Sequence, residues 1–206
     1  MDLSLMMFSP LRIVGRLFPP VYKRSLARYV SSLCDNGSKI LDVGCDDGTM
    51  ARRVMDFNSS LSVVGVDVQA NRPSKIERVV YHGKKLPFPD NSFDIVMALD
   101  VLHHVEDNEA LLREMKRVAN KYIIIKDHLY HSTFSKVIIS VVDYCLNLPY
   151  GIKCAFNYLS MNEWMALFDR LDLKVIEMPK RLSFGFGLSE KYNPIFKLSI
   201  LNGRSE

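Results

Sequence analysis

The stretch Lys39-Ile40-Leu41-Asp42-Val43-Gly44-Cys45-Asp46-Asp47-Gly48-Thr49 determines how the rest of the chain is interpreted. Its first half is apolar enough for a short buried strand, and two glycines then bracket a tight loop. A run with helical character follows, with apolar side chains at Ala51, Val54 and Met55. A strand that enters a glycine-bearing turn and then a helix is the element with which α/β proteins hold a cofactor against backbone N–H groups.

A second apolar run, residues 61–67, ends in the carboxylate of Asp67. An acidic side chain at the tip of the second strand is placed to accept hydrogen bonds from both hydroxyls of a ribose. The pattern Gly44-x-x-x-Gly48 alone is weak evidence, because it lacks the full dinucleotide fingerprint. Together, the loop and the acid predict that the chain binds a nucleoside cofactor.

Strand and helix patterns alternate through most of residues 39–125. Apolar runs indicate further strands at 78–81, 93–99 and 122–125, and a break at 71–74 is expected to lead into a short helix. Helical spacing of apolar residues covers 21–33 and 108–119. Strands with almost no polar alternation are what a parallel sheet covered on both faces requires. The sequence therefore predicts a doubly wound α/β sheet.

The pattern changes after residue 126. Apolar residues at 134–148 indicate a helix that is apolar around much of its circumference, and a capping box at 160–163 begins another helix. Two final strands are expected at 174–178 and 195–200. We expect an N-terminal helical segment, residues 1–37, and one domain, residues 38–206, with a helical, lid-like insertion at about 129–159.

The composition is that of an ordinary globular protein. Of 206 residues, 48% are hydrophobic and 24% are charged, and the formal net charge is +4. No run has the length and apolarity of a membrane span, and no convincing cleavage site follows the N-terminal residues. The four cysteines have neither metal-ligand nor disulfide spacing, which favours reduced thiols and a cytoplasmic location.

The first 28 residues are rich in basic side chains. This pattern fits a helix that touches a membrane surface or covers a hydrophobic substrate. It also fits an ordinary helix with a solvated basic face, which we favour. Because no concentrated basic stripe is present, we expect no nucleic-acid partner.

Taken together, these stretches resemble the class I S-adenosylmethionine-dependent methyltransferases, especially the small-molecule branch that includes quinone-ring methyltransferases. The resemblance is strong over roughly residues 38–126. It rests on the first loop, on Asp67, on the Leu-Pro-Phe to Phe-Asp segment at 86–94 and on Asp-Val-Leu-His-His-Val at 100–105. It implies a Rossmann-like, seven-stranded sheet of order 3-2-1-4-5-7-6, with the last strand antiparallel and helices on both faces.

The resemblance also implies that S-adenosylmethionine is the cofactor. The residues that it assigns to cofactor binding are Asp42, Gly44, Cys45, Asp46, Gly48, Asp67, Val68, His82, Gly83 and Asp100. Asp67 would bind the ribose and Val68 would lie beside the adenine.

Two positions depart from the family pattern. Asp46 stands where the family usually has a glycine, and a left-handed conformation there is strained for Asp, although less than for most residues. His82 stands where an adenine-contacting acid is often found. These departures favour the main alternative to an enzyme, which is a protein of the same fold that binds the cofactor without catalysis or no longer binds it.

Methyl transfer from a sulfonium needs alignment, a dry site and, for a hydroxyl acceptor, a base. The candidates for that base are His128 and His103, which follow strands at the edge where open α/β sheets place their sites. The alternative for this region is that Asp100 and His104 only brace the following helix. Asp127, His128 and His131 also suggest a metal cluster, but a clear third ligand is lacking and no metal is expected.

The insertion predicts the kind of acceptor. Its apolar helix and the aromatic residues near it, among them Tyr158, form either a lid over a hydrophobic or aromatic acceptor or a helix that completes the core. We therefore expect methyl transfer to a small, apolar or aromatic molecule, with release of S-adenosylhomocysteine. A nicotinamide oxidoreductase is disfavoured because the third glycine is missing, and a nucleic-acid methyltransferase because no Asn/Asp-Pro-Pro-Tyr-type tetrapeptide follows the fourth strand.

Overall fold

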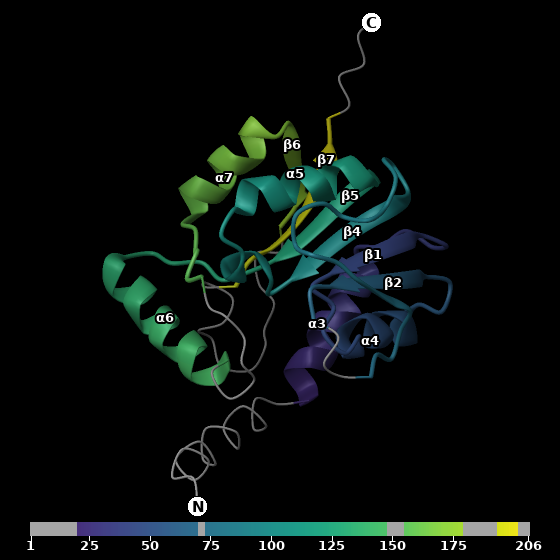
Figure 1. The fold of residues 1–206 in the computed structure, drawn as a ribbon, viewed down its shortest axis with the longest axis horizontal. Helices are drawn as coiled ribbons and strands as arrows, with labels where there is room; N and C mark the ends of the chain where they lie inside the picture. Colours follow the sequence, from purple (N-terminus) through teal and green to yellow (C-terminus); the bar gives the residue numbers. More distant parts are fainter. Residues whose placement is uncertain (1–19, 70–72, 148–154, 179–192, 202–206) are drawn as a thin grey trace, which may run out of the picture.

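The computed structural model describes residues 20–69, 73–147, 155–178 and 193–201 (Figure 1). The N-terminal residues 1–19 and the glycine-bearing loop at 179–192 lie outside the described residues. The helices are α3 Pro20–Ser32, α4 Thr49–Phe57, the 3₁₀ turn η1 Leu102–His104, α5 Asn108–Val118, α6 Thr133–Asn147 and α7 Met161–Arg170. The strands are β1 Lys39–Val43, β2 Ser62–Asp67, β3 Arg78–Val80, β4 Phe93–Leu99, β5 Ala119–Lys126, β6 Leu173–Glu177 and β7 Ile195–Ile200.

The seven strands form one sheet in the order β3-β2-β1-β4-β5-β7-β6. The pairs from β3 to β5 are parallel, and β7 is antiparallel to both β5 and β6. This confirms the predicted fold class and strand order. Because β1, β2, β4 and β5 are parallel, their carboxyl ends meet at one edge of the sheet, and the chain leaves every one of these strands there.

Helices cover both faces of this sheet (Figure 1). Helices α5 and α7 cover one face, where Leu112, Met115 and Trp164 are at most 1% exposed, and α3 and α4 cover the other with Leu26 and Val54. Successive side chains of a strand point to opposite faces. Consecutive residues of β1 and of β5 therefore belong to different core clusters, which explains their near-continuous apolar sequences.

Helix α3 contributes to the second core and is not a separate appendage. Its residues Leu26, Ala27 and Val30 are at most 1% exposed and lie in the same cluster as residues of α4 and of the sheet. This placement agrees with the favoured alternative for residues 20–32, an ordinary helix packed on the domain. The predicted boundary at residue 37 therefore follows a helix that already belongs to the core.

Two sequence predictions differ from the structure. No helix forms at residues 73–77, because their backbone pairs elsewhere: Lys75 N–H donates to Asp47 O (2.9 Å) and Glu77 O accepts from Gly65 N–H (2.8 Å). The fifth strand begins at Ala119, which the sequence pattern assigns to the preceding helix. Ala119 pairs with Phe93, and this register extends the strand to eight residues.

Helix α6 stands apart from the two helical layers, beyond the edge at which the parallel strands end (Figure 1). Its exposed apolar side chains are Phe134, Val137, Ile138, Val141, Val142 and Tyr144, with exposed fractions between 47% and 74%. The helix therefore does not complete the core, which was one of its two sequence interpretations. Within the described ranges, no helix is long and apolar enough to cross a membrane.

Substitution of Gly44 by alanine tests how tightly the first loop is packed. It has φ +71°, and a Cβ there would lie 2.6 Å from Val101 Cγ2, whereas Gly37 has φ +76° with no atom within 4 Å of its Cβ position. Gly44→Ala and Gly37→Ala should each lower the free energy of unfolding by about 1 kcal/mol, because alanine is strained in the left-handed conformation. Gly44→Ala should lose about 1–3 kcal/mol more through steric overlap.

Urea unfolding of the two variants measures this difference. The additional Val101→Ala change should restore part of the stability that Gly44→Ala loses, because it removes both colliding methyl groups. Equal losses at Gly44 and Gly37 would contradict the close approach of Val101.

Candidate functional site

A pocket of about 780 Å³ opens at the carboxyl edge of the parallel strands. Ten of the twelve predicted site residues line it, namely Asp42, Gly44, Cys45, Asp46, Asp67, Val68, Gly83, Asp100, His103 and His128. Gly48 and His82 are not among the lining residues. The sequence reasoning did not assign Tyr81, Asp143 and Asn147 to the site, although they line the pocket as well.

The first loop is tied to the tip of β2. Asp67 Oδ2 accepts a hydrogen bond from Asp46 N–H (2.8 Å), and Asp67 Oδ1 accepts one from Gln69 N–H (2.9 Å). Asp46 has φ +46°, so the left-handed conformation considered for this position is present. Arg78 Nη1 donates to Asp46 O (2.6 Å) and holds the loop from the β3 side. The Asp67 carboxylate is therefore fixed in direction before any ligand binds.

The same loop starts α4. Gly48 N–H donates to Cys45 O (2.8 Å) with φ +70° at Gly48, and Asp47 Oδ1 accepts from Thr49 N–H (2.9 Å). This bond satisfies one of the backbone donors at the helix N-terminus that has no partner inside the helix. Gly48 is thus needed for the turn even though it does not line the pocket.

Two buried groups at this end of the pocket are neutral. Burial, and then the charge of Asp67, raises the pKa of Asp42 to about 8, and its side chain is 3% exposed. Burial, with Asp42 and Asp67 adding to it, raises the pKa of the Cys45 thiol to about 12. At neutral pH the Cys45 side chain is therefore a thiol, which is a poor nucleophile.

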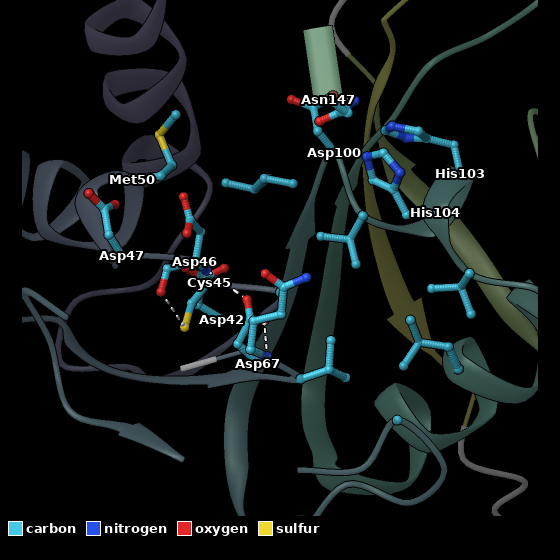
Figure 2. A pocket seen from close by; sticks show the side chains of 18 of the residues that line it. Asp42, Cys45, Asp46, Asp47, Met50, Asp67, Asp100, His103, His104 and Asn147 are labelled. Atoms are coloured by element: carbon cyan, nitrogen blue, oxygen red, sulfur yellow. Dashed lines mark hydrogen bonds between the residues drawn. The ribbon is translucent and has the colours of Figure 1, made fainter. Parts of the chain in front are cut away.

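The charges on the pocket wall are mostly negative. Besides the neutral Asp42, the wall contains five aspartates, and among its residues Lys23 is the one lysine or arginine. Figure 2 shows Asp42, Asp46 and Asp67 grouped at one end and the rings of His103 and His104 at the other. This wall suits a ligand with cationic groups and hydroxyl donors at the aspartate end, and it opposes one that carries phosphates.

His103 lies between two carboxylates at the opposite end. Its Nδ1 is 2.5 Å from Asp127 Oδ1 and its Nε2 is 3.7 Å from Asp143 Oδ1. Burial alone would lower the pKa of His103, but the charges and hydrogen bonds of Asp127 and Asp143 outweigh it and raise the pKa to about 10. The ring is 2% exposed and stacks on Tyr158, whose hydroxyl donates to Asp143 Oδ2 (2.8 Å).

His128 is the more accessible histidine of the two candidates. Its side chain is 27% exposed, and its Nε2 is 3.9 Å from Asp100 Oδ1. Burial is the largest influence on its pKa and lowers it, so the ring is neutral at pH 7. Asp100, with φ +61°, also pairs with the buried Lys126, whose Nζ lies 3.1 Å from Asn193 Oδ1. Asp100 therefore faces a lysine and a histidine at once.

Residues that the sequence patterns do not bring together form this end of the pocket. The sequence suggested Asp127, His128 and His131 as a metal cluster and disfavoured it. Among the described residues, the structure instead gathers His103, His128 and Asp143, with one ligand atom of each within 4.8 Å of the others. Asp143 is the one acid of α6, a helix otherwise made of apolar, hydroxyl, amide and lysine side chains. That isolated acid was the available signal.

The comparisons with known proteins agree on one kind of domain. A family model described as a methyltransferase domain matches residues 41–122. The chain is 33% identical over 95 residues to the 27-O-demethylrifamycin SV methyltransferase of Amycolatopsis mediterranei, which covers 40% of this chain and 35% of that protein. Residues 41–122 thus match a methyltransferase domain. It is also 33% identical over 115 residues to the sterol 24-C-methyltransferase ERG6B of Gibberella zeae, with 47% of this chain and 30% of that protein covered.

A solved structure extends the likeness over nearly the whole fold. The S-adenosylmethionine-dependent methyltransferase from Aquifex aeolicus matches with a TM-score of 0.62 and 19% identity, covering 92% of this chain and 98% of that one. At this identity the match concerns the fold. The chain spans about a third of the length of the two curated relatives.

The cofactor that these comparisons imply is S-adenosylmethionine. Its charged and donor groups are a sulfonium, an ammonium, a carboxylate and two ribose hydroxyls. The aspartates of the pocket suit the two cations and the hydroxyls, and the fixed carboxylate of Asp67 faces the same space. A nicotinamide dinucleotide would bring two phosphates against these aspartates. The residues present therefore fit the implied cofactor better than the dinucleotide.

The buried Asp42 makes stability depend on pH. The folded protein holds its proton up to a pKa of about 8, whereas an unfolded chain releases it near pH 4. Unfolding between these values releases a proton, so this residue's contribution is complete below about pH 4 and is lost as the pH rises to 8. Asp42→Asn should remove this loss.

Urea unfolding of the wild type and of Asp42→Asn at pH 5.5 and pH 8.5 measures the effect. The free energy of unfolding of the variant, relative to the wild type, should increase by about 1 kcal/mol or more between the two pH values. Parallel pH profiles for the two proteins would show that Asp42 is ionised in the folded state.

Proposed function

We propose that this protein transfers a methyl group from S-adenosylmethionine to a small, apolar or aromatic acceptor and releases S-adenosylhomocysteine. The observation that carries the proposal is one continuous pocket with the fixed Asp67 carboxylate at one end and His103, His104 and His128 at the other. A cofactor held at the aspartate end and an acceptor at the histidine end would meet inside the same cavity.

The chain's own residues would bind and align the two molecules. The cofactor supplies a methyl group on a cationic sulfonium. Asp67 accepts hydrogen bonds from the ribose hydroxyls, and Val68 and Gly83, which lie close to each other, offer an apolar contact for the adenine. Asp46 adds a carboxylate near the methionine end. Alignment of the methyl group with the acceptor atom is the main requirement of such an in-line displacement.

His128 is proposed as the base for a hydroxyl acceptor. It lines the pocket with a partly exposed ring, whereas the ring of His103 is almost fully buried and both of its nitrogens face carboxylates. A base must reach the proton that it removes, and a group that is already protonated cannot take another. His103 is therefore the less suitable of the two candidate bases.

The acceptor class is inferred from the wall near the histidines. Leu99, Val101, Val105 and Leu111 give the pocket apolar surface, and Asp143 and Asn147 of α6 add polar groups. The two relatives described above are named for a rifamycin derivative and for a sterol, both small molecules with large apolar parts. These features are consistent with a small acceptor, including the quinone-ring acceptor that the sequence resemblance implies. We also propose that the protein is cytoplasmic, as the cysteine pattern predicts.

A protein that binds the cofactor without catalysis is the second candidate. The observation that favours it is Asp46, which brings an extra carboxylate into the pocket in a left-handed conformation. Such a carboxylate would oppose the carboxylate of S-adenosylmethionine if the two came close. Cofactor titration alone does not separate this candidate from an enzyme, so methyl transfer must be measured as well.

Asp67→Asn tests cofactor binding. Loss of the carboxylate charge and of one hydrogen-bond acceptor should weaken S-adenosylmethionine binding at least about tenfold, as measured by calorimetric titration of the full chain. Asp56→Asn, an exposed acid on α4 outside the pocket, is the matched control and should bind as the wild type does. Absence of binding to the wild type, or equal affinity of Asp67→Asn, would reject the assignment.

His128→Gln tests the base. With an acceptor found among phenols and hydroquinones, turnover should decrease about 10² to 10⁴-fold while the affinity for S-adenosylmethionine stays unchanged. His131→Gln, a nearby exposed histidine outside the pocket lining, is the control. If His128→Gln turns over the acceptor at the wild-type rate, another group removes the proton or none is needed.

A further inference from the structure

The histidine end of the pocket contains more metal-ligating groups than a sulfonium displacement requires. His103 belongs to η1, His128 follows β5 and Asp143 belongs to α6, so three separate elements meet here. We propose that His103, His128 and Asp143 form a binding site for a divalent first-row transition-metal ion, of the Zn²⁺ type, with one coordination position open to the pocket. The first support is that one ligand atom of each residue lies within 4.8 Å of the other two.

The surroundings of His103 are those of a metal-ligating histidine. Asp127 Oδ1 lies 2.5 Å from His103 Nδ1, which directs the opposite nitrogen, Nε2, toward Asp143. Asp127 is itself held by the N–H groups of Leu102 (2.8 Å) and His128 (2.6 Å). A carboxylate that receives the second ring N–H is the usual partner of a histidine bound to a metal, because it fixes the ring's orientation.

Hydrogen bonds also fix the orientation of the Asp143 carboxylate. Its Oδ2 accepts the hydroxyl of Tyr158 (2.8 Å), while its Oδ1 faces His103 Nε2 at 3.7 Å. The side chain is 9% exposed. Oδ1 also accepts a hydrogen bond from Asn147 Nδ2 (2.7 Å), so both oxygens are held by the protein. A carboxylate oxygen has two lone pairs, and the second one on Oδ1 would bind the ion on the side of His103 Nε2.

The charge balance favours a cation. Asp127 and Asp143 are 1% and 7% exposed and face the same imidazole ring, so two buried carboxylates share one possible positive group. Lys126 does not supply the missing charge, since its ammonium pairs with Asp100. Buried charges are costly unless they are paired or coordinate a metal, and a divalent ion would balance both.

The ligand types select the ion. Two imidazoles and one carboxylate suit zinc, iron and other first-row transition metals, whereas Mg²⁺ and Ca²⁺ prefer sites made of oxygen alone. Three protein ligands with an open position are typical of sites that bind a further molecule. Ligand atoms around Zn²⁺ lie about 3.4 Å apart, so the side chains would have to approach one another by about 1 Å on binding.

Cation binding requires neither the cofactor nor an acceptor, so the inference stands apart from the proposed methyl transfer. The two roles of His128 exclude each other on one molecule, because a neutral imidazole has a single nitrogen lone pair for either an ion or a proton. Turnover by His128→Gln should therefore be compared with that of chelator-treated wild type.

The experiment is a calorimetric titration of the chelator-treated full chain with ZnCl₂. The expected result is one ion per chain with micromolar or tighter affinity, and visible absorption bands of low-coordinate Co²⁺ when CoCl₂ is used instead. Asp143→Asn and His128→Gln should each weaken Zn²⁺ binding at least about tenfold, and Asp127→Asn about 10- to 100-fold. His82→Gln and His131→Gln, two exposed histidines outside the cluster, should bind as the wild type does.

Circular dichroism of each metal-free variant shows whether it is folded. The partly exposed His128 still allows the test if the buried Asp143→Asn change prevents folding. Absence of a Zn²⁺ or Co²⁺ signal with the wild type would overturn the proposal. So would unchanged affinity in the folded cluster variants, or an equal loss in His131→Gln, because binding would then occur at surface histidines.

Discussion

The carbonyl oxygen of Val66 accepts hydrogen bonds from the N–H groups of Gly44 (2.8 Å) and Cys45 (3.3 Å), and the rest of the site depends on this contact. It turns the chain at the end of β1 and keeps the turn against the end of β2. Asp67, the next residue, can then receive the N–H of Asp46. Because Gly44 also lies directly against Val101, the loop is held between the end of β2 and the segment that follows β4.

The two ends of the pocket differ in charge and in how the chain brings their residues together. The aspartate end is built from residues close in sequence or on paired strands, and its hydrogen bonds are mostly to backbone. The histidine end is built from side chains of η1, of the segment that follows β5, of α6 and of Tyr158, which contact one another. The family match at residues 41–122 includes the aspartate end and His103, and it ends before Asp127, His128 and Asp143.

The sequence predicted the aspartate end well because its signals are local. A buried strand, two glycines and an acid after the next strand specify a turn whatever surrounds it. Seven of the ten predicted residues that line the pocket belong to this part of the chain, residues 42–83. His82 and Gly48 were assigned to cofactor binding by position in the family pattern alone, yet the chain brings Tyr81 and Gly83 to the wall instead. Side chains of adjacent residues in an extended segment point in opposite directions, and pattern matching does not settle which one faces inward.

The histidine end was less predictable, because it depends on where α6 lies. Nothing local in 134–148 indicates that Asp143 meets His103, forty residues earlier in the chain. The same holds for residues 73–77, which have turn-forming residues but give their hydrogen bonds to the first loop instead of forming a helix. In both places tertiary contacts decide the outcome, while the capping box at Ser160, a purely local signal, was predicted correctly.

Helix α6 is joined to the domain in an unusual way. Much of its apolar surface faces solvent. Its contacts with other described residues include Asp143 with Tyr158 and His103, Lys136 over the Tyr130 ring and Tyr144 beside the Phe156 ring. Apolar burial supplies most of the free energy that holds helices in place, so α6 draws little on it. Helices with few buried apolar contacts open at a lower free energy than the global fold. We therefore expect this wall of the pocket to open locally at a lower free energy than the sheet and its two helical layers.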